Sequence, residues 1–187
     1  MGSDRLVGED MLRLGRRRFL QLGVLGAGAS LLALPVPVSL ADEKPCTPDK
    51  PKAEVLLLTC MDYRLTEKTT SYMLERKLAG NYDHIVLAGA SVGVLQTKHK
   101  AWGDTFRQHV KVAVDLHCIN RVMVLDHRDC GAYGEFVERG LGQNPPRETQ
   151  VHTRYLKDLR TRMKKWYPKL QVELLLMDLD GKVETIA

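Results

Sequence analysis

The sequence lacks internal repeats, low-complexity tracts and a strong excess of charge of either sign. Its 187 residues carry a formal net charge of +5, to which the first 41 residues contribute five arginines against three acids. The remaining net charge of +3 is too small to indicate a protein that binds nucleic acid. The excess bases gather between Arg154 and Lys169, where they are typical of a solvated helix face. With 44% hydrophobic and 27% charged residues, the chain has the composition of an ordinary globular domain.

Cysteine is also scarce, with four residues in the chain. This number is compatible with two disulfides in an exported protein. Cys60 and Cys130, however, stand in sequence motifs that argue against their pairing. Cys118 lies among apolar residues and is expected to be a buried, small hydrophobic side chain. Cys46 lies near the N-terminal side of the domain, and the sequence indicates no function for it.

Residues 1–41 are predicted to be a twin-arginine-type signal peptide. The segment Arg16-Arg17-Arg18-Phe19-Leu20-Gln21 is followed by an apolar stretch at 22–34, and the small-residue site Ser39-Leu40-Ala41 favours cleavage after its last residue. The chain is therefore expected to be a periplasmic protein, exported in the folded state by the twin-arginine machinery. The uncharged stretch 19–40 leaves an uncleaved N-terminal membrane anchor as the alternative.

The mature chain is predicted to be an arm at 42–53 followed by one α/β domain at 54–187. Buried-strand patterns alternate with helical periodicity, which predicts a mostly parallel sheet of four to five strands flanked by helices. Residues 89–93 are predicted to form a loop, and Asn120 is expected to end a helix in the left-handed conformation. Strands are predicted at Glu54–Thr59, His84–Ala88, Arg121–Leu125, Gln171–Met177 and Val183–Ile186, and helices at Thr66–Leu78, Trp102–His117, Gly131–Gly140 and Glu148–Trp166.

Two short cysteine motifs follow two of the predicted strands. Thr59-Cys60-Met61-Asp62-Tyr63-Arg64 comes after the apolar run at 55–58, and Leu125-Asp126-His127-Arg128-Asp129-Cys130-Gly131 comes after the run at 122–124. In an open α/β sheet, the ends of such strands point into one crevice. Two thiols and an imidazole brought together there form a soft set of sulfur and nitrogen ligands that suits zinc.

The order Cys-x-Asp-x-Arg and then His-x-x-Cys-Gly, each after a strand, resembles the β-class carbonic anhydrases. The resemblance runs from about Ala53 to the C-terminus. It implies that Cys60, His127 and Cys130 hold a catalytic Zn²⁺ and leave a fourth position for water. It also implies a homodimer or a higher homo-oligomer.

The resemblance assigns the catalytic roles to Asp62 and Arg64. Arg64 is expected to hold the carboxylate of Asp62 by a forked pair of hydrogen bonds and to keep it ionised. Asp62 would accept a hydrogen bond from zinc-bound hydroxide, or would itself ligate the zinc in a closed, inactive form. In the open form the hydroxide attacks the carbon of CO₂ and bicarbonate leaves. The implied activity is the reversible hydration of CO₂, a small-molecule substrate.

The sequence departs from the family after the second predicted strand. The family usually carries Arg-Asn-Ala-Gly-Asn there, whereas this chain has Val86-Leu87-Ala88-Gly89-Ala90, in which the polar members are absent. The residue before His127 is Asp126, where the family usually has glycine. Asp126 is expected to sit behind the zinc ligands as a hydrogen-bond acceptor.

These departures leave two alternatives open. A more apolar pocket wall at Val86, Leu87 and Ala90 would also suit a zinc hydrolase of COS or CS₂, which are small, linear and apolar like CO₂. A non-catalytic, zinc-binding relative is the other alternative. The presence of both Asp62 and Arg64 weighs against it, because zinc storage does not need that pair.

Overall fold

The computed structural model describes residues 46–47 and 52–187. The predicted signal peptide at 1–41 lies outside the described residues, as does most of the predicted arm at 42–53. All described residues belong to the unit Asp42–Ala187. Within this part of the chain, no helix combines the length and the apolar character needed to cross a membrane.

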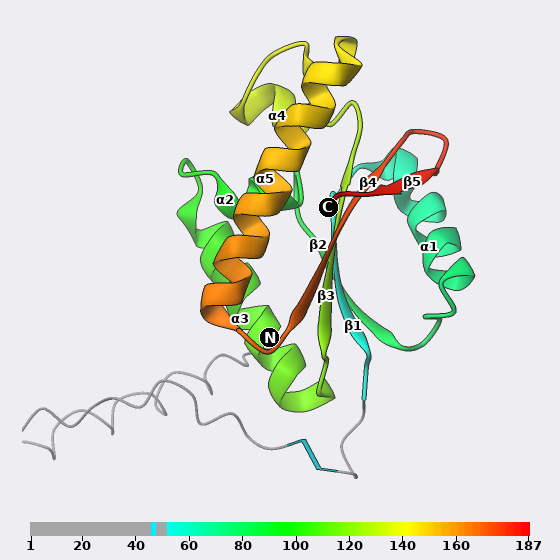
Figure 1. Cartoon of the computed structure of the whole chain (residues 1–187), viewed down its shortest axis with the longest axis vertical. Helices are drawn as coiled ribbons and strands as arrows, with labels where there is room; N and C mark the ends of the chain where they lie inside the picture. Colours follow the sequence, from blue (N-terminus) through cyan, green and yellow to red (C-terminus); the bar gives the residue numbers. More distant parts are fainter. Residues whose placement is uncertain (1–45, 48–51) are drawn as a thin grey trace, which may run out of the picture. The chain divides into compact units, whose positions relative to one another are not determined.

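A five-stranded sheet runs through the middle of the domain in the order β2-β1-β3-β4-β5 (Figure 1). The first four strands are parallel to one another, and the short β5 pairs with β4 in the antiparallel direction. The predicted fold class, a mostly parallel α/β sheet flanked by helices, is confirmed. The strands are β1 (Val55–Thr59), β2 (Tyr82–Val86), β3 (Arg121–His127), β4 (Gln171–Met177) and β5 (Val183–Thr185).

Helices cover both faces of the sheet (Figure 1). One face carries α1, and the opposite face carries α3 and α5. Two short helices, α2 and α4, begin close to the ends of strands. The helices are α1 (Thr66–Glu75), α2 (Ser91–Leu95), α3 (Lys100–His117), α4 (Gly131–Phe136) and α5 (Pro145–Trp166), with 3₁₀ turns η1 (Tyr63–Leu65) and η2 (Leu141–Gln143).

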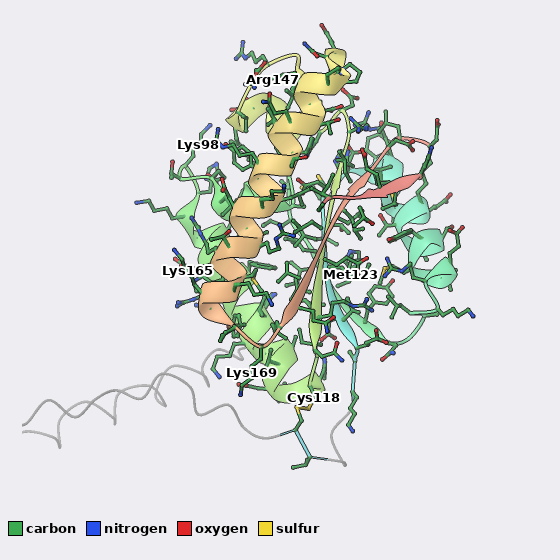
Figure 2. All side chains as sticks on the ribbon, viewed as in Figure 1. Lys98, Cys118, Met123, Arg147, Lys165 and Lys169 are labelled. Carbon is green, nitrogen blue, oxygen red and sulfur yellow. A yellow bond between two sulfur atoms is a disulfide. The ribbon has the colours of Figure 1, made fainter. Side chains whose placement is uncertain are left out.

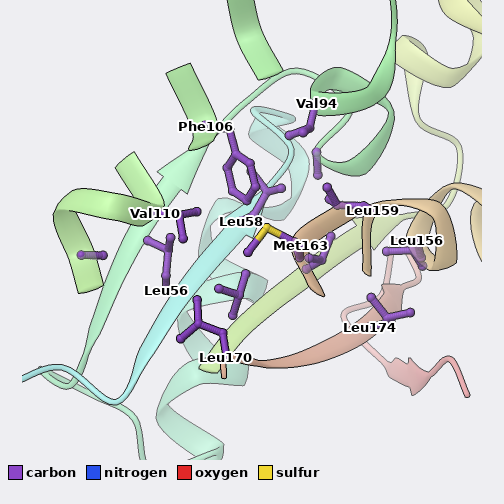
Figure 3. Close-up of a cluster of buried hydrophobic side chains, with 14 of the residues drawn as sticks. Leu56, Leu58, Val94, Phe106, Val110, Leu156, Leu159, Met163, Leu170 and Leu174 are labelled. Atoms are coloured by element: carbon purple, nitrogen blue, oxygen red, sulfur yellow. The ribbon is translucent and has the colours of Figure 1, made fainter. Parts of the chain in front are cut away.

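Each face of the sheet has its own apolar core. Leu56 and Leu58 of β1 belong to the larger core with α3 and α5, whereas Val55 and Leu57 belong to the smaller core under α1. Figure 3 shows the larger core, where Phe106 of α3 lies close to Leu58 of β1. Because β1 is buried on both faces, its sequence is apolar without interruption.

Several helix ends differ from the prediction: α3 begins at Lys100, α5 begins at Pro145 and α4 already ends at Phe136. The C-terminal ends of α1 and α3 have a clear physical explanation. The first helix stops before Leu78, because Lys77 adopts a left-handed φ of +59° and the N–H of Leu78 donates back to the carbonyl of Met73 at 3.0 Å. This is a Schellman ending, in which the two apolar side chains also meet in the core. The left-handed residue that ends α3 is Cys118, with φ of +57°, and not Asn120 as expected.

The helix α2 replaces the predicted loop at 89–93. The sequence predicts a loop here because the segment is short and contains two glycines and other small residues. It is helical in the fold because Ser91, Val92 and Val94 are all buried against neighbouring elements. Tertiary packing therefore outweighs the weak local preference.

Cys118 forms a disulfide with Cys46, so the prediction that it is an unpaired hydrophobic side chain is wrong. Figure 2 shows Cys118 at the C-terminal end of α3. Next to it, the N–H of Ala53 donates to the carbonyl of His117 at 2.9 Å. The chain before β1 is thus joined to the end of α3 covalently at Cys46 and by a hydrogen bond at Ala53.

Candidate metal centre

The adjacent strands β1 and β3 deliver the predicted ligands to one edge of the sheet. Cys60 directly follows β1, and His127 is the last residue of β3. Cys130 comes three residues later, at the N-terminal end of α4. Because the two strands are parallel neighbours, their carboxyl ends lie side by side, and residues some seventy positions apart meet.

The three side chains lie close enough together to bind one metal ion. One ligand atom from each of Cys60, His127 and Cys130 lies within 4.8 Å of the others, and the two Sγ atoms are 3.9 Å apart. Nδ1 of His127 lies 2.8 Å from the carbonyl of Arg128, so this nitrogen carries the hydrogen. Nε2 is buried and has no hydrogen-bond partner among the described residues. An acceptor nitrogen aimed at two thiols fits a zinc ion.

The two thiols have opposite electrostatic environments. The pKa of Cys60 lies well below its ordinary value, chiefly because Cys130 donates a hydrogen bond to it; the N–H of Gly89 also donates, and the imidazole of His127 lies nearby. The pKa of Cys130 is raised, because it shares that hydrogen bond and is buried. Burial alone would disfavour a charged His127, but the contact with Cys60 outweighs it and raises the pKa of the imidazole. The site therefore favours one thiolate even without a metal.

Gly89 approaches the first thiol with its backbone. Its N–H donates to Sγ of Cys60 at 3.2 Å, and its φ is +75°. A Cβ atom at this position would lie 2.5 Å from Val92 and 2.8 Å from Ala132. Both the left-handed backbone and the close packing therefore require glycine here.

Asp62 and Arg64 form the predicted forked pair. Nε and Nη2 of Arg64 donate to the two carboxylate oxygens of Asp62 at 3.0 and 2.7 Å, and the backbone N–H of Arg64 donates at 3.0 Å. The hydrogen bonds from Arg64 are the largest cause that lowers the pKa of Asp62 to about 2. Oδ2 of Asp62 lies 3.8 Å from Nε2 of His127. The carboxylate is thus ionised and adjacent to the ligand atoms.

Arg64 also binds a second acid that sequence reasoning missed. Its Nη1 donates to Oδ2 of Asp129 at 2.8 Å, and its Nη2 donates to the carbonyl of the same residue at 3.0 Å. Asp129 has a left-handed φ of +53°, and its N–H donates to the buried carboxylate of Glu148 at 2.6 Å. The position of Asp129 between two ligands was the available signal, but its contact with Arg64 spans 65 residues.

The predicted apolar wall is largely absent. Ala90 is fully buried in the larger core and Leu87 packs against that core, so these two residues do not line the metal centre. Val86 is exposed at 53% on the edge strand β2. Asp126 is buried beside the ligands as a hydrogen-bond acceptor.

Comparison with known proteins identifies the family. A family profile described as "Putative carbonic anhydrase" matches residues 50–187. The chain belongs to this carbonic anhydrase family. It is 36% identical over 135 residues to an uncharacterized protein of Rickettsia bellii, and the match covers 72% of this chain and 82% of the relative. An uncharacterized protein of Rickettsia conorii is also 36% identical over 135 residues, which cover 72% of this chain and 73% of the relative.

Two solved β-carbonic anhydrases are among the structures to which this member of the carbonic anhydrase family is similar. A tetrameric β-carbonic anhydrase of Sordaria macrospora is 14% identical with a TM-score of 0.44, and the match covers 73% of this chain and 82% of that one. The β-carbonic anhydrase isoform I of Trichomonas vaginalis is 17% identical with a TM-score of 0.45, and the match covers 76% and 86% of the two chains.

Proposed function

We propose that this protein is a zinc-dependent carbonic anhydrase that catalyses the reversible hydration of CO₂ to bicarbonate. The observation that carries the proposal is the convergence of Cys60, Cys130 and the unpartnered Nε2 of His127 at one edge of the sheet. Two thiols and one imidazole match the ligands of catalytic zinc sites that keep an open position. Membership of a carbonic anhydrase family supports the reaction.

The residues of the metal centre have separate proposed roles in this reaction. Cys60, His127 and Cys130 would hold the zinc, and Zn²⁺ bound there would lower the pKa of a coordinated water and so supply a nucleophile. Asp62 would accept a hydrogen bond from the reacting water and orient it, because its carboxylate lies 3.8 Å from the ligand nitrogen. Arg64 would keep that carboxylate ionised and aimed through its forked hydrogen bonds.

The structure weakens the argument for a hydrolase of COS or CS₂. That alternative depended on an apolar wall that included Leu87 and Ala90, and both residues pack into the core instead. Hydrolysis of COS or CS₂ is therefore treated as one result that the activity assay below can give. A non-catalytic zinc protein is a further outcome, which the position of Asp62 beside the ligands disfavours.

Stopped-flow CO₂ hydration by the zinc-loaded protein tests the proposal, with zinc content measured by elemental analysis. The wild type is expected to hydrate CO₂, and Asp62→Asn is expected to lose about 10²–10⁴-fold in rate, the usual worth of a positioned proton acceptor. Asp104→Asn makes the same change at an exposed position on α3 and should keep the wild-type rate. A zinc-loaded wild type that releases sulfide from COS or CS₂ but does not hydrate CO₂ would overturn the proposed reaction, and a zinc-loaded protein inactive in both assays would indicate a non-catalytic relative.

We propose further that the protein is exported to the periplasm by the twin-arginine machinery. The arginine-rich N-terminal motif supports this, and so does the Cys46–Cys118 disulfide, because disulfides persist in oxidising compartments. Cell fractionation with Arg16→Lys/Arg17→Lys/Arg18→Lys tests it, since loss of export is expected, and N-terminal sequencing would separate cleavage after Ala41 from an uncleaved anchor. A homodimer or larger homo-oligomer, proposed from the family resemblance, is tested by light scattering of the purified protein.

A further inference from the structure

A buried carboxylate lies directly behind the metal centre. Asp126, the residue before His127 on β3, is only 1% exposed. Its Oδ1 accepts the N–H of Ser91 at 3.0 Å. Its Oδ2 accepts the hydroxyls of Ser91 and Tyr133, both at 2.6 Å, and lies 3.1 Å from Nδ1 of His152. The two hydroxyl oxygens are themselves 2.8 Å apart.

All four members of this network are removed from solvent. Ser91 and His152 are 0% exposed, and Tyr133 is 1% exposed. A buried carboxylate is costly unless donors satisfy it, and the four contacts provide those donors. Burial raises the pKa of Tyr133 far above its ordinary value, so its hydroxyl remains a donor. Such a network gives more rigidity than an apolar filling, but only while it is complete.

Two of the donor residues, Ser91 and Tyr133, come from segments that adjoin a cysteine ligand of the candidate metal centre. Ser91 is two residues after Gly89, whose N–H donates to Sγ of Cys60. Between them, Ala90 has a strained φ of +41°, a conformation that persists only when its surroundings hold it. The pair of hydrogen bonds from Ser91 to the buried carboxylate provides that hold.

The thiol of Cys130 lies next to Tyr133, which is another member of the network. Tyr133 lies in the first turn of α4, which begins directly after Cys130, and its side chain is buried in the same cluster as that thiol. Its hydroxyl donates to Asp126. The ring of Tyr133 lies against that of His152, tilted by 41° and with the centroids 3.8 Å apart, so α5 supports the network from behind.

We propose that Asp126 is a positioning residue that fixes the two thiols relative to His127 before zinc binds. Its carboxylate joins the backbone segment that donates to Cys60 and the helix turn that begins at Cys130 to the strand that carries the imidazole. The inference rests on the proposed zinc function and adds a second acid to it, separate in role from Asp62. Asp62 faces the reacting water, whereas Asp126 acts only through the ligands.

Three substitutions that remove parts of the network test this role. Tyr133→Phe and Ser91→Ala each delete one hydroxyl donor with little change in volume, and Asp126→Asn removes the charge. The matched control is Tyr155→Phe, because this ring packs edge-on against Tyr133 at 5.4 Å but its hydroxyl is not part of the network. The readouts are the zinc dissociation constant by chelator competition, the absorption spectrum of the cobalt-substituted protein and the unfolding of the metal-free protein.

A positioning role predicts about 10–100-fold weaker zinc binding in Tyr133→Phe and in Ser91→Ala, the usual effect of removing a group that orients metal ligands. The ligand-field bands of cobalt should shift in these variants, and Tyr155→Phe should match the wild type in both measurements. If Asp126→Asn does not fold, the two hydroxyl deletions still decide the question.

Two results would overturn the inference, and they differ from failure of the proposed function. Unchanged zinc affinity and cobalt spectra in both hydroxyl deletions would do so. An equal loss of stability in the metal-free and zinc-loaded forms, without a change in affinity, would show that the network supports only the fold. A folded wild type that does not bind zinc would instead refute the proposed function, and the positioning role with it.

Discussion

Replacing both Cys46 and Cys118 by serine is expected to lower the free energy of unfolding by about 2–4 kcal/mol. The disulfide joins residues 72 positions apart. In the chain-entropy model, closing a loop of that length in the unfolded chain corresponds to about 4 kcal/mol, which sets the upper bound.

The lower bound on the stability loss, about 2 kcal/mol, follows from the effect of the disulfide on the folded state. Ala53 is already held to His117 by a backbone hydrogen bond, so in the native protein the disulfide closes only the stretch from residue 46 to Ala53. In the serine variant this short loop, roughly eight residues long, is no longer closed in the folded state, which offsets part of the effect on the unfolded chain. The difference between the entropies of the long and the short loop then remains, and it amounts to about 2 kcal/mol.

Guanidinium unfolding of the zinc-loaded protein, without reductant, measures the effect. The denaturant slope should rise in the variant, because an unfolded chain without the cross-link exposes more surface. Each single serine variant should lose nearly as much stability as the double variant, because either change removes the bond. A loss below about 1 kcal/mol with an unchanged slope would refute the reasoning, because loop closure would then contribute almost nothing.

Replacing Arg64 by glutamine should raise the pKa of Asp62 from about 2 toward its ordinary 3.8, as a carbon-13 NMR titration of the metal-free protein would show. The pKa of Asp62 is lower in the folded state than in the unfolded state, so the pair stabilises the fold above pH 3.8. This contribution disappears as the pH falls from 3.8 to about 2, and the Arg64→Gln variant should therefore lose less stability than the wild type over that interval. Cys130→Ser should prevent stoichiometric zinc binding, and elemental analysis that still finds one zinc per chain would contradict its role as a ligand. Leu156→Ala should lower the unfolding free energy by about 2–5 kcal/mol, because this side chain is fully buried against the sheet. Leu74→Ala, at a position 56% exposed, should change it by less than about 0.5 kcal/mol, and denaturant unfolding compares the two.

The sequence was sufficient for the parts of the structure that depend on local patterns. The unbroken apolar run of β1 predicted a strand buried on both faces, and the two cysteine motifs at strand ends predicted where the side chains would meet. The pairing of Asp62 with Arg64 was also predictable, because the two residues are neighbours on one 3₁₀ turn and need no distant contact.

The sequence was insufficient where tertiary contacts decide the outcome. The helix α2 has too few residues and too many small ones to be recognised, and burial alone makes it regular. The partner of Cys118 lies 72 residues away in a segment without a distinctive pattern. For Asp126 the sequence suggested an acceptor behind the ligands, but not the three donors, which come from 35, 7 and 26 residues away.

Arg64 has a consequence for any attempt to transplant this centre into another scaffold. Its guanidinium binds an acid from the first motif and an acid from the second, and the second is itself held by Glu148 of α5. A graft of the first motif alone would lack Asp129, so the guanidinium of Arg64 would lose one of its two acidic partners. Arg64 would then hold Asp62 in position less firmly. The smallest portable unit therefore comprises two parallel strand ends and the first turn of α5, which carries Glu148.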